Sequence, residues 1–111
     1  MNDERPKSEI NVLTRESLLS TLRDQQGYLS LNYGVRRIGL FGSFAKGEQK
    51  RTSDVDLLVE LEKPLGFRFI DMTEYLEKLV GRKLDVLTPE GLKGIRLKKT
   101  TENIERELIY V

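Results

Sequence analysis

Two aspartates separated by a single residue, Asp54 and Asp56, open an apolar stretch in the middle of the chain. Alternate residues of a β-strand point to the same face, so a strand over residues 53–61 would place both carboxylates on one side. Their Cα atoms would lie about 7 Å apart, and their charges would repel by roughly 2 kcal/mol at an effective dielectric of 20. Magnesium relieves such repulsion and prefers a few carboxylates together with substrate phosphates. The pair therefore predicts a magnesium site, and a solvated strand edge is the alternative.

A glycine–serine pair ends the preceding apolar run, and a basic loop follows it. Gly42 lets the backbone approach a phosphate closely, and Ser43 can offer its hydroxyl and its amide. A short helix starting here would aim free N–H groups at the same anion. Lys46, and further on Lys50 and Arg51, lie between this turn and the aspartates, where a polyphosphate needs countercharge. We expect Gly42, Ser43 and Lys46 to bind phosphate; an ordinary turn with a solvated loop tip is the alternative.

A third aspartate, Asp85, interrupts a short apolar run that we interpret as a strand over residues 82–87. The apolar neighbours on either side of it take the opposite face of such a strand. If the two strands are adjacent, Asp85 joins Asp54 and Asp56 in a triad of carboxylates. Taken alone, an aspartate here could instead pair with a nearby lysine or arginine.

The composition limits the chemistry that the chain can perform. Its 111 residues are enough for one domain with a core, and 38% of them are hydrophobic. The 19 basic and 18 acidic residues nearly cancel to a net charge of +1, which gives no general surface for nucleic acid or membranes. Nucleotide binding must therefore come from a local site.

The sequence contains neither cysteine nor histidine. Disulfides, cysteine nucleophiles and cysteine-held zinc are excluded, and so are the commonest general base and transition-metal ligand. A metal would be held by carboxylates, which favours magnesium, with manganese also possible. The N-terminal residues do not form a signal peptide and no apolar stretch is long enough to span a bilayer, so we expect a cytoplasmic protein.

The order of elements predicts an α/β (α+β) domain with a small mixed β-sheet flanked by helices. Residues 1–13 form a polar tail and residues 14–111 the domain. Thr14 can cap a helix that runs to about Asn32, and Gly34 is a plausible stop. The other expected elements, in order, are a strand over 35–41, a strand over 53–61, a helix over 67–80, a strand over 82–87, a helix starting at Thr88-Pro89, a helix over 98–108, and an apolar end at 109–111 that forms a short strand or a partner contact.

The arrangement Gly42-Ser43, ten residues, Asp54-Val55-Asp56 resembles the signature of the DNA polymerase β-like nucleotidyltransferase superfamily. The small size is similar to that of minimal nucleotidyltransferase (MNT) domain proteins, which are commonly the antitoxin halves of HEPN–MNT toxin–antitoxin pairs. The similarity runs from about Tyr33 to the C-terminus and implies the polymerase β-like palm fold. Asp85 matches the third carboxylate of the family, whereas Lys46 stands where the family often has arginine, which keeps the charge but loses the bidentate fork.

The resemblance implies a magnesium-dependent nucleotidyl transfer, with AMP transfer from ATP as the leading expectation. Asp54 and Asp56 would hold two magnesium ions, one of which binds the triphosphate and the leaving pyrophosphate. The other ion, shared with Asp85, would lower the pKa of the attacking hydroxyl. Asp85 is also a candidate to accept the hydroxyl proton, since no histidine is available. Asp54, Asp56 and Asp85 are thus the expected catalytic and metal-binding residues.

The acceptor of the nucleotide is expected to come from a partner, because the chain has no room for a further acceptor-binding domain. The resemblance implies a HEPN-domain toxin, an RNase that is silenced by adenylylation of a tyrosine. One alternative is a nucleotide-binding antitoxin with a weak or vestigial site that neutralises its partner by direct binding. Another is a small-molecule nucleotidyltransferase whose acceptor pocket lies within the monomer or across a homodimer.

Overall fold

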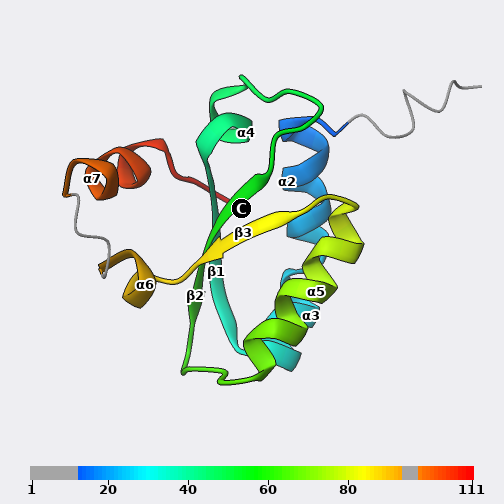
Figure 1. Cartoon of the computed structure of the whole chain (residues 1–111). Helices are drawn as coiled ribbons and strands as arrows, with labels where there is room; N and C mark the ends of the chain where they lie inside the picture. The colour runs from blue at the N-terminus through cyan, green and yellow to red at the C-terminus, as the bar shows by residue number, and fades with distance from the viewer. Residues whose placement is uncertain (1–12, 94–97) are drawn as a thin grey trace, which may run out of the picture.

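A four-stranded mixed sheet forms the centre of the molecule, and helices cover both of its faces (Figure 1). The computed structural model describes residues 13–93 and 98–111. The predicted fold class is confirmed, while the expected tail lies outside the described residues except for Leu13. The elements, in chain order, are α2 (Arg15–Asp24), α3 (Gln26–Tyr33), β1 (Val35–Phe41), α4 (Gly42–Lys46), β2 (Val55–Leu61), α5 (Arg68–Val80), β3 (Leu84–Leu87), α6 (Pro89–Lys93), α7 (Lys98–Glu107) and β4 (Ile109–Tyr110).

The strands lie in the order β3-β2-β1-β4. β1 pairs with β2 and with β4 in antiparallel fashion, whereas β2 and β3 are parallel and are connected by the crossover helix α5. The register sets Asp56 opposite Phe41 on one neighbouring strand and opposite Asp85 on the other. Asp56 and Asp85 therefore lie on adjacent strands, which was the condition for the triad expected from the sequence.

The helices α2, α3 and α5 cover one face of the sheet and enclose the main core (Figure 1). The inward residues of β2, which are Val55, Leu57 and Val59, are completely buried there. α5 contributes Met72 and Leu76 and ends at Val80, as predicted, with Gly81 as its left-handed C-cap. The other face of β2 carries Asp56, Leu58 and Glu60, of which only Leu58 is buried, so the two faces of the strand differ in character.

The single helix predicted over 14–32 was wrong in one respect, because the chain forms two helices, α2 and α3, that meet at Gln25. Gln25 lies outside the helical region of backbone angles, and its N–H returns to the carbonyls of Leu22 and Arg23. The apolar spacing hides this bend, since Leu22 and Leu29 are both fully buried on its two sides. The predicted stop at Gly34 is confirmed by its left-handed conformation.

The opposite face of the sheet carries the helices α6 and α7 (Figure 1). They cover a second, smaller apolar cluster that consists of Phe41, Leu58, Leu92 and Ile104. The predicted start of a helix at Thr88-Pro89 is confirmed, and the hydroxyl of Thr88 accepts a hydrogen bond of 3.1 Å from the N–H of Gly91. Gly94, a further glycine just after this helix, lies outside the described residues.

Two strand boundaries differ from the prediction. β2 begins at Val55 and not at residue 53, and β3 begins at Leu84 and not at residue 82. Asp54 therefore precedes its strand, although Val55 still donates a hydrogen bond of 3.1 Å to the carbonyl of Lys83. Across the parts of the chain that the structure describes, none of the helices has the length and apolar character needed to cross a membrane.

Candidate active site

The three aspartates lie at the end of the sheet where β1 finishes and β2 begins. Asp56 is partly buried, and Asp54 and Asp85 are exposed. In the parallel pair of strands, Asp56 and Asp85 are direct register partners and point from the same face. Asp54, two residues before Asp56, lies close enough to influence its charge. The structure thus brings all three predicted carboxylates into one region.

The electrostatics of this region are governed by mutual repulsion of carboxylates. The pKa of Asp56 is raised to about 6, first because burial disfavours the charged form. The negative charges of Asp85 and Asp54 raise it further, as does a hydrogen bond between the Asp56 and Asp85 side chains. A cation bound between these oxygens would remove the repulsion.

Gly42 lies directly against the Asp56 carboxylate. Its φ angle is +76°, in the left-handed region that favours glycine, and a Cβ added there would overlap Asp56 Oδ2 and stand 3.0 Å from Cγ. Any side chain at this position would therefore displace the carboxylate. This contact with Asp56 is a separate reason for a glycine here, and the role of Gly42 in phosphate binding stays a prediction.

The turn after β1 is a short helix, α4, which begins at Gly42 as expected. Ser43 is half-buried near its start, and Lys46 lies at its exposed end. Lys46 Nζ forms an ion pair of 3.1 Å with Glu107 Oε2 of α7. Lys50 and Arg51 form an exposed turn further along the loop, as the solvated alternative predicted.

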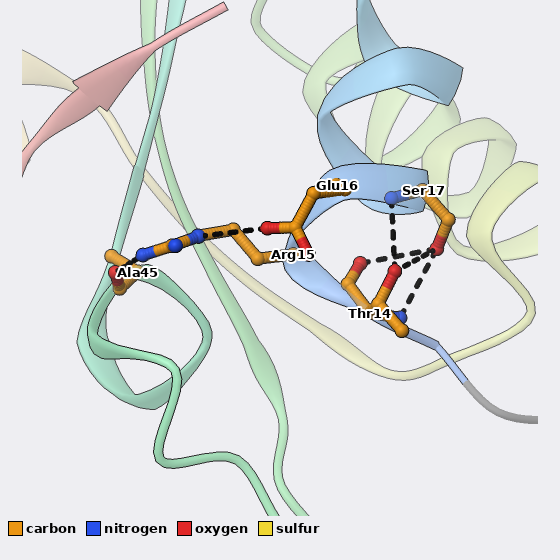
Figure 2. A network of polar contacts seen from close by, with 5 residues as sticks. All are labelled: Thr14, Arg15, Glu16, Ser17 and Ala45. Atoms are coloured by element: carbon orange, nitrogen blue, oxygen red, sulfur yellow. Dashed lines mark hydrogen bonds and ion pairs between the residues drawn. The ribbon is translucent and has the colours of Figure 1, made fainter.

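Two arginines that the sequence analysis did not identify form long-range hydrogen bonds in this region. Arg15, at the start of α2, donates a hydrogen bond of 2.9 Å to the carbonyl of Ala45 in α4. Figure 2 shows Arg15 reaching across to α4 beside the capping box that Thr14 and Ser17 form. Because the capping box stabilises the first turn of α2, it also holds the backbone of Arg15 in place.

Arg82, two residues before β3, contacts both α4 and the loop that precedes β2. It donates a hydrogen bond of 2.8 Å to the carbonyl of Ser53, and its guanidinium lies 5.6 Å from the centre of the Phe44 ring. The loop that leads into Asp54 is thereby held against the helix that follows Gly42. Both arginine contacts are long-range, so no local sequence signal could have revealed them.

A metal ion at this site would have to share its coordination with a substrate. Among the residues described, no three acidic side chains are arranged so that they could hold a metal ion by themselves. The donor chemistry still fits magnesium, which takes oxygen ligands and usually completes its shell with water and phosphate oxygens. The roles of Asp54, Asp56 and Asp85 as metal ligands stay predictions.

Comparison with known proteins identifies the family. The nucleotidyltransferase domain family matches residues 22–111, which includes every predicted site residue. The chain belongs to the nucleotidyltransferase domain family. The protein adenylyltransferase MntA of Thermococcus cleftensis is 42% identical over 101 residues, which cover 90% of this chain and 98% of that protein.

Solved structures share the fold. A chain classed as a minimal nucleotidyltransferase is 30% identical with a TM-score of 0.68, and the match covers 87% of this chain and 95% of that one. A toxin–antitoxin structure with AMP-PNP is 20% identical with a TM-score of 0.59, covering 88% of this chain and 72% of that one. At that identity the second likeness shows the fold alone.

For a nucleotidyltransferase, the residue that sequence reasoning most clearly missed is Glu107. It lies at the end of α7, pairs with Lys46, and its charge contributes to the raised pKa of Asp56. A glutamate in a helix rich in charged residues is ordinary in sequence terms. Only the packing of α7 on the sheet brings it to the site.

Proposed function

We propose that this chain is a protein adenylyltransferase that transfers AMP from ATP to a tyrosine hydroxyl of a HEPN-domain toxin and so acts as its antitoxin. The observation that carries the proposal is the placement of Asp56 opposite Asp85, with Gly42 against the Asp56 carboxylate. The relative MntA, 42% identical over nearly its whole length, is named for adenylyl transfer to protein. The toxin–antitoxin structure with AMP-PNP shares the fold, and the proposal extends a nucleotide and a toxin partner to this chain.

In the proposed reaction the acceptor oxygen attacks the α-phosphorus of ATP. The bond from that phosphorus to the oxygen of the β-phosphate breaks, and pyrophosphate leaves with the electron pair. Asp85, exposed at the site, accepts the proton of the hydroxyl. The backbone at Gly42 and Ser43 lies against the phosphates, with Lys46 as countercharge. When magnesium is bound by the three aspartates and phosphate oxygens, it lowers the pKa of the hydroxyl and offsets the charge of the leaving group.

The openness of the site favours a protein acceptor. Asp54 and Asp85 are both exposed, so that a side chain presented by another protein can reach them. Such exposure suits an acceptor hydroxyl that a partner protein brings to the site.

An antitoxin that acts by direct binding is the second candidate function. It is favoured by one observation, which is that no three acidic side chains among the described residues could hold a metal ion without help. In that case the aspartates would bind a nucleotide weakly and the contact with the toxin would suffice for neutralisation.

The decisive experiment incubates the purified protein with ATP, magnesium and a HEPN-domain toxin as partner, and then measures intact masses. We expect the partner to gain AMP. Asp56→Asn and Asp85→Asn should each reduce the rate by a hundredfold or more, since each removes a carboxylate that contacts the reacting groups. Peptide mapping should place the added AMP on a tyrosine.

Asp71→Asn is the matched control, because Asp71 is an exposed aspartate on α5, on the face of the sheet that lacks the site. This variant should transfer AMP at the wild-type rate. If the partner gains no mass while a tight complex still forms, the direct-binding alternative replaces the enzyme.

A further inference from the structure

One partly buried arginine, Arg82, bridges two segments that are far apart in the chain. Its guanidinium donates a hydrogen bond of 2.8 Å to the carbonyl of Ser53 and lies 5.6 Å from the centre of the Phe44 ring. Ser53 immediately precedes Asp54, and Phe44 is buried in α4, the helix that begins at Gly42. The same side chain therefore contacts the loop that carries one predicted catalytic aspartate and the helix that begins against another.

Asp54 is the aspartate that depends most on such support. It precedes β2, so its backbone lies outside the ladder of hydrogen bonds that the strand forms with its neighbours. Asp56, by contrast, has register partners on both sides, in β1 and in β3. The direction of the exposed Asp54 carboxylate is therefore set by how the two neighbouring peptide groups are held.

Both neighbours of Asp54 are bound to the two residues that precede β3. The N–H of Val55 donates a hydrogen bond of 3.1 Å to the carbonyl of Lys83, and the carbonyl of Ser53 accepts from the Arg82 side chain. The first bond joins backbone groups, so no substitution at residue 83 other than proline affects its chemistry. The second bond depends on the Arg82 side chain alone, and its loss releases Asp54 on one side.

The segment that carries Arg82 is itself firmly held. The N–H of Gly81 donates a hydrogen bond of 2.8 Å to the carbonyl of Glu77, and the N–H of Leu84 donates one of 3.1 Å to the Glu77 carboxylate. Glu77 belongs to α5, which packs into the main core. The guanidinium of Arg82 thus extends from a fixed base to the loop before β2.

We propose that Arg82 is a positioning residue for Asp54, which it holds beside Asp56 so that the two carboxylates can bind one divalent cation. A guanidinium suits this role because it is always charged, presents donors in a rigid plane and stacks on an aromatic ring. The proposal rests on the proposed function and adds to it a residue that assembles the site without contact with the substrate.

The experiment measures ATP binding to the whole protein by isothermal titration calorimetry at a series of magnesium concentrations, with no partner present. Magnesium should strengthen ATP binding by the wild type, and the magnesium concentration that gives half of this effect is the quantity compared. Arg82→Gln should raise that concentration about tenfold, which corresponds to loss of a charge-assisted hydrogen bond. At saturating magnesium the ATP affinity of this variant should return to that of the wild type.

Lys83→Gln is the matched control for Arg82→Gln. It removes the same charge from the next residue, whose side chain is exposed, and it leaves the carbonyl that binds Val55 in place. This variant should show the wild-type dependence on magnesium. Arg82→Lys should lie between the wild type and Arg82→Gln, because an ammonium group can donate to the Ser53 carbonyl but lacks the planar fork. Thermal melts establish that all three variants are folded.

A pair of double variants tests whether Arg82 acts through Asp54. In the Asp54→Asn background, the further change Arg82→Gln should not alter the dependence on magnesium, because the carboxylate that Arg82 positions is gone. In the Asp85→Asn background, the same change should still raise the magnesium requirement. An equal effect of Arg82→Gln in both backgrounds would mean that Arg82 acts by another route, and would overturn the proposal.

The outcomes separate this inference from the proposed function. If Arg82→Gln weakens ATP binding equally at every magnesium concentration, or leaves it unchanged, Arg82 does not position a metal-binding carboxylate. If the magnesium dependence shifts as expected while no AMP reaches the toxin, the positioning role stands and the transferase proposal fails. If magnesium does not strengthen ATP binding by the wild type, the positioning role is overturned, and transfer of AMP to the toxin then decides the proposed function by itself.

Discussion

The two faces of the sheet differ in how they are held together. On the face under α2, α3 and α5, Val55, Leu57 and Val59 of β2 are fully buried in one large core. On the face that carries the aspartates, the described residues form a smaller cluster around Leu58 and Phe41 that supports α6 and α7. Stability is thus concentrated on one side of each strand and chemistry on the other. A β-strand allows this division because its residues alternate between faces.

The largest expected effect is on stability, and it comes from truncating Leu57 and Leu58, two consecutive residues on opposite faces of β2. Leu57→Ala empties a site in the main core and should lower the free energy of unfolding by about 4 kcal/mol, and Leu58→Ala, in the smaller cluster, by about 2 kcal/mol. Urea denaturation measures both values. A larger cost for Leu58→Ala than for Leu57→Ala would contradict the division between the faces.

ATP binding by Leu57→Ala and Leu58→Ala, measured at a temperature where both remain folded, also compares the two faces of the sheet. Leu57→Ala should bind ATP as the wild type does, since the main core does not line the site. Leu58→Ala should bind it several-fold more weakly, because Leu58 is among the residues that anchor α7 and thus Glu107. Equal ATP affinities in the two variants would show that the smaller cluster does not position the site.

A smaller change in stability but a large one in activity is expected at Gly42. Gly42→Ala should lower AMP transfer about a hundredfold, because the added methyl group overlaps the Asp56 carboxylate. Gly47→Ala is the control, since Gly47 has a φ of +74° but no atom within 4 Å of the added group. Both variants should lose about 1–2 kcal/mol of stability from the left-handed backbone alone. Comparable rates in the two variants would contradict the overlap as the cause.

The smallest expected effect is a dependence of stability on pH in magnesium-free buffer. The pKa of Asp56 is about 6 in the folded chain, above the ordinary value of about 3.9 for an unfolded aspartate. The folded state thus binds its proton more tightly, and the free energy of unfolding falls as pH rises from about 4 to 6. Above pH 6 Asp56 is charged, and the full penalty to the free energy of unfolding applies. Below pH 4 it is protonated in both the folded and the unfolded state, and there is no penalty.

Asp56→Asn removes that penalty. It should be more stable than the wild type by about 1 kcal/mol at pH 8, a figure reduced because the side chain is partly exposed to water, and equally stable below pH 4. Urea denaturation at both pH values, with a chelator present, measures the difference. A wild type at least as stable as Asp56→Asn at pH 8 would show that the repulsion among the aspartates has been overstated.

Local patterns were sufficient to predict most elements of the fold. The alternation in β2, the glycines that end α3 and α5, and the Thr-Pro start of α6 are each determined by a few neighbouring residues. The bend at Gln25 was missed because the apolar spacing continues through it. Asp54 lies just outside β2, because the end of a strand depends on where its neighbouring strand begins to pair.

The candidate site was predictable to the extent that it follows from strand geometry. Asp54 and Asp56 are linked by the period of one strand, and Gly42 by the turn before it. The contacts of Arg15, Arg82 and Glu107 join segments far apart in the chain. Such contacts depend on how helices pack on the sheet, and single-sequence patterns do not contain that information.

The parallel register that sets Asp85 beside Asp56 also determines which insertions homologous proteins can tolerate. The separation of these aspartates along the chain is set by the length of the crossover through α5, whereas their meeting depends only on which residues face each other across two strands. Insertions in the crossover would leave the pair intact, but a shift of one residue in β3 would turn Asp85 to the other face. The third acidic position of a distant homologue is therefore best sought by its phase within the strand, and not by a fixed count of residues from the first two.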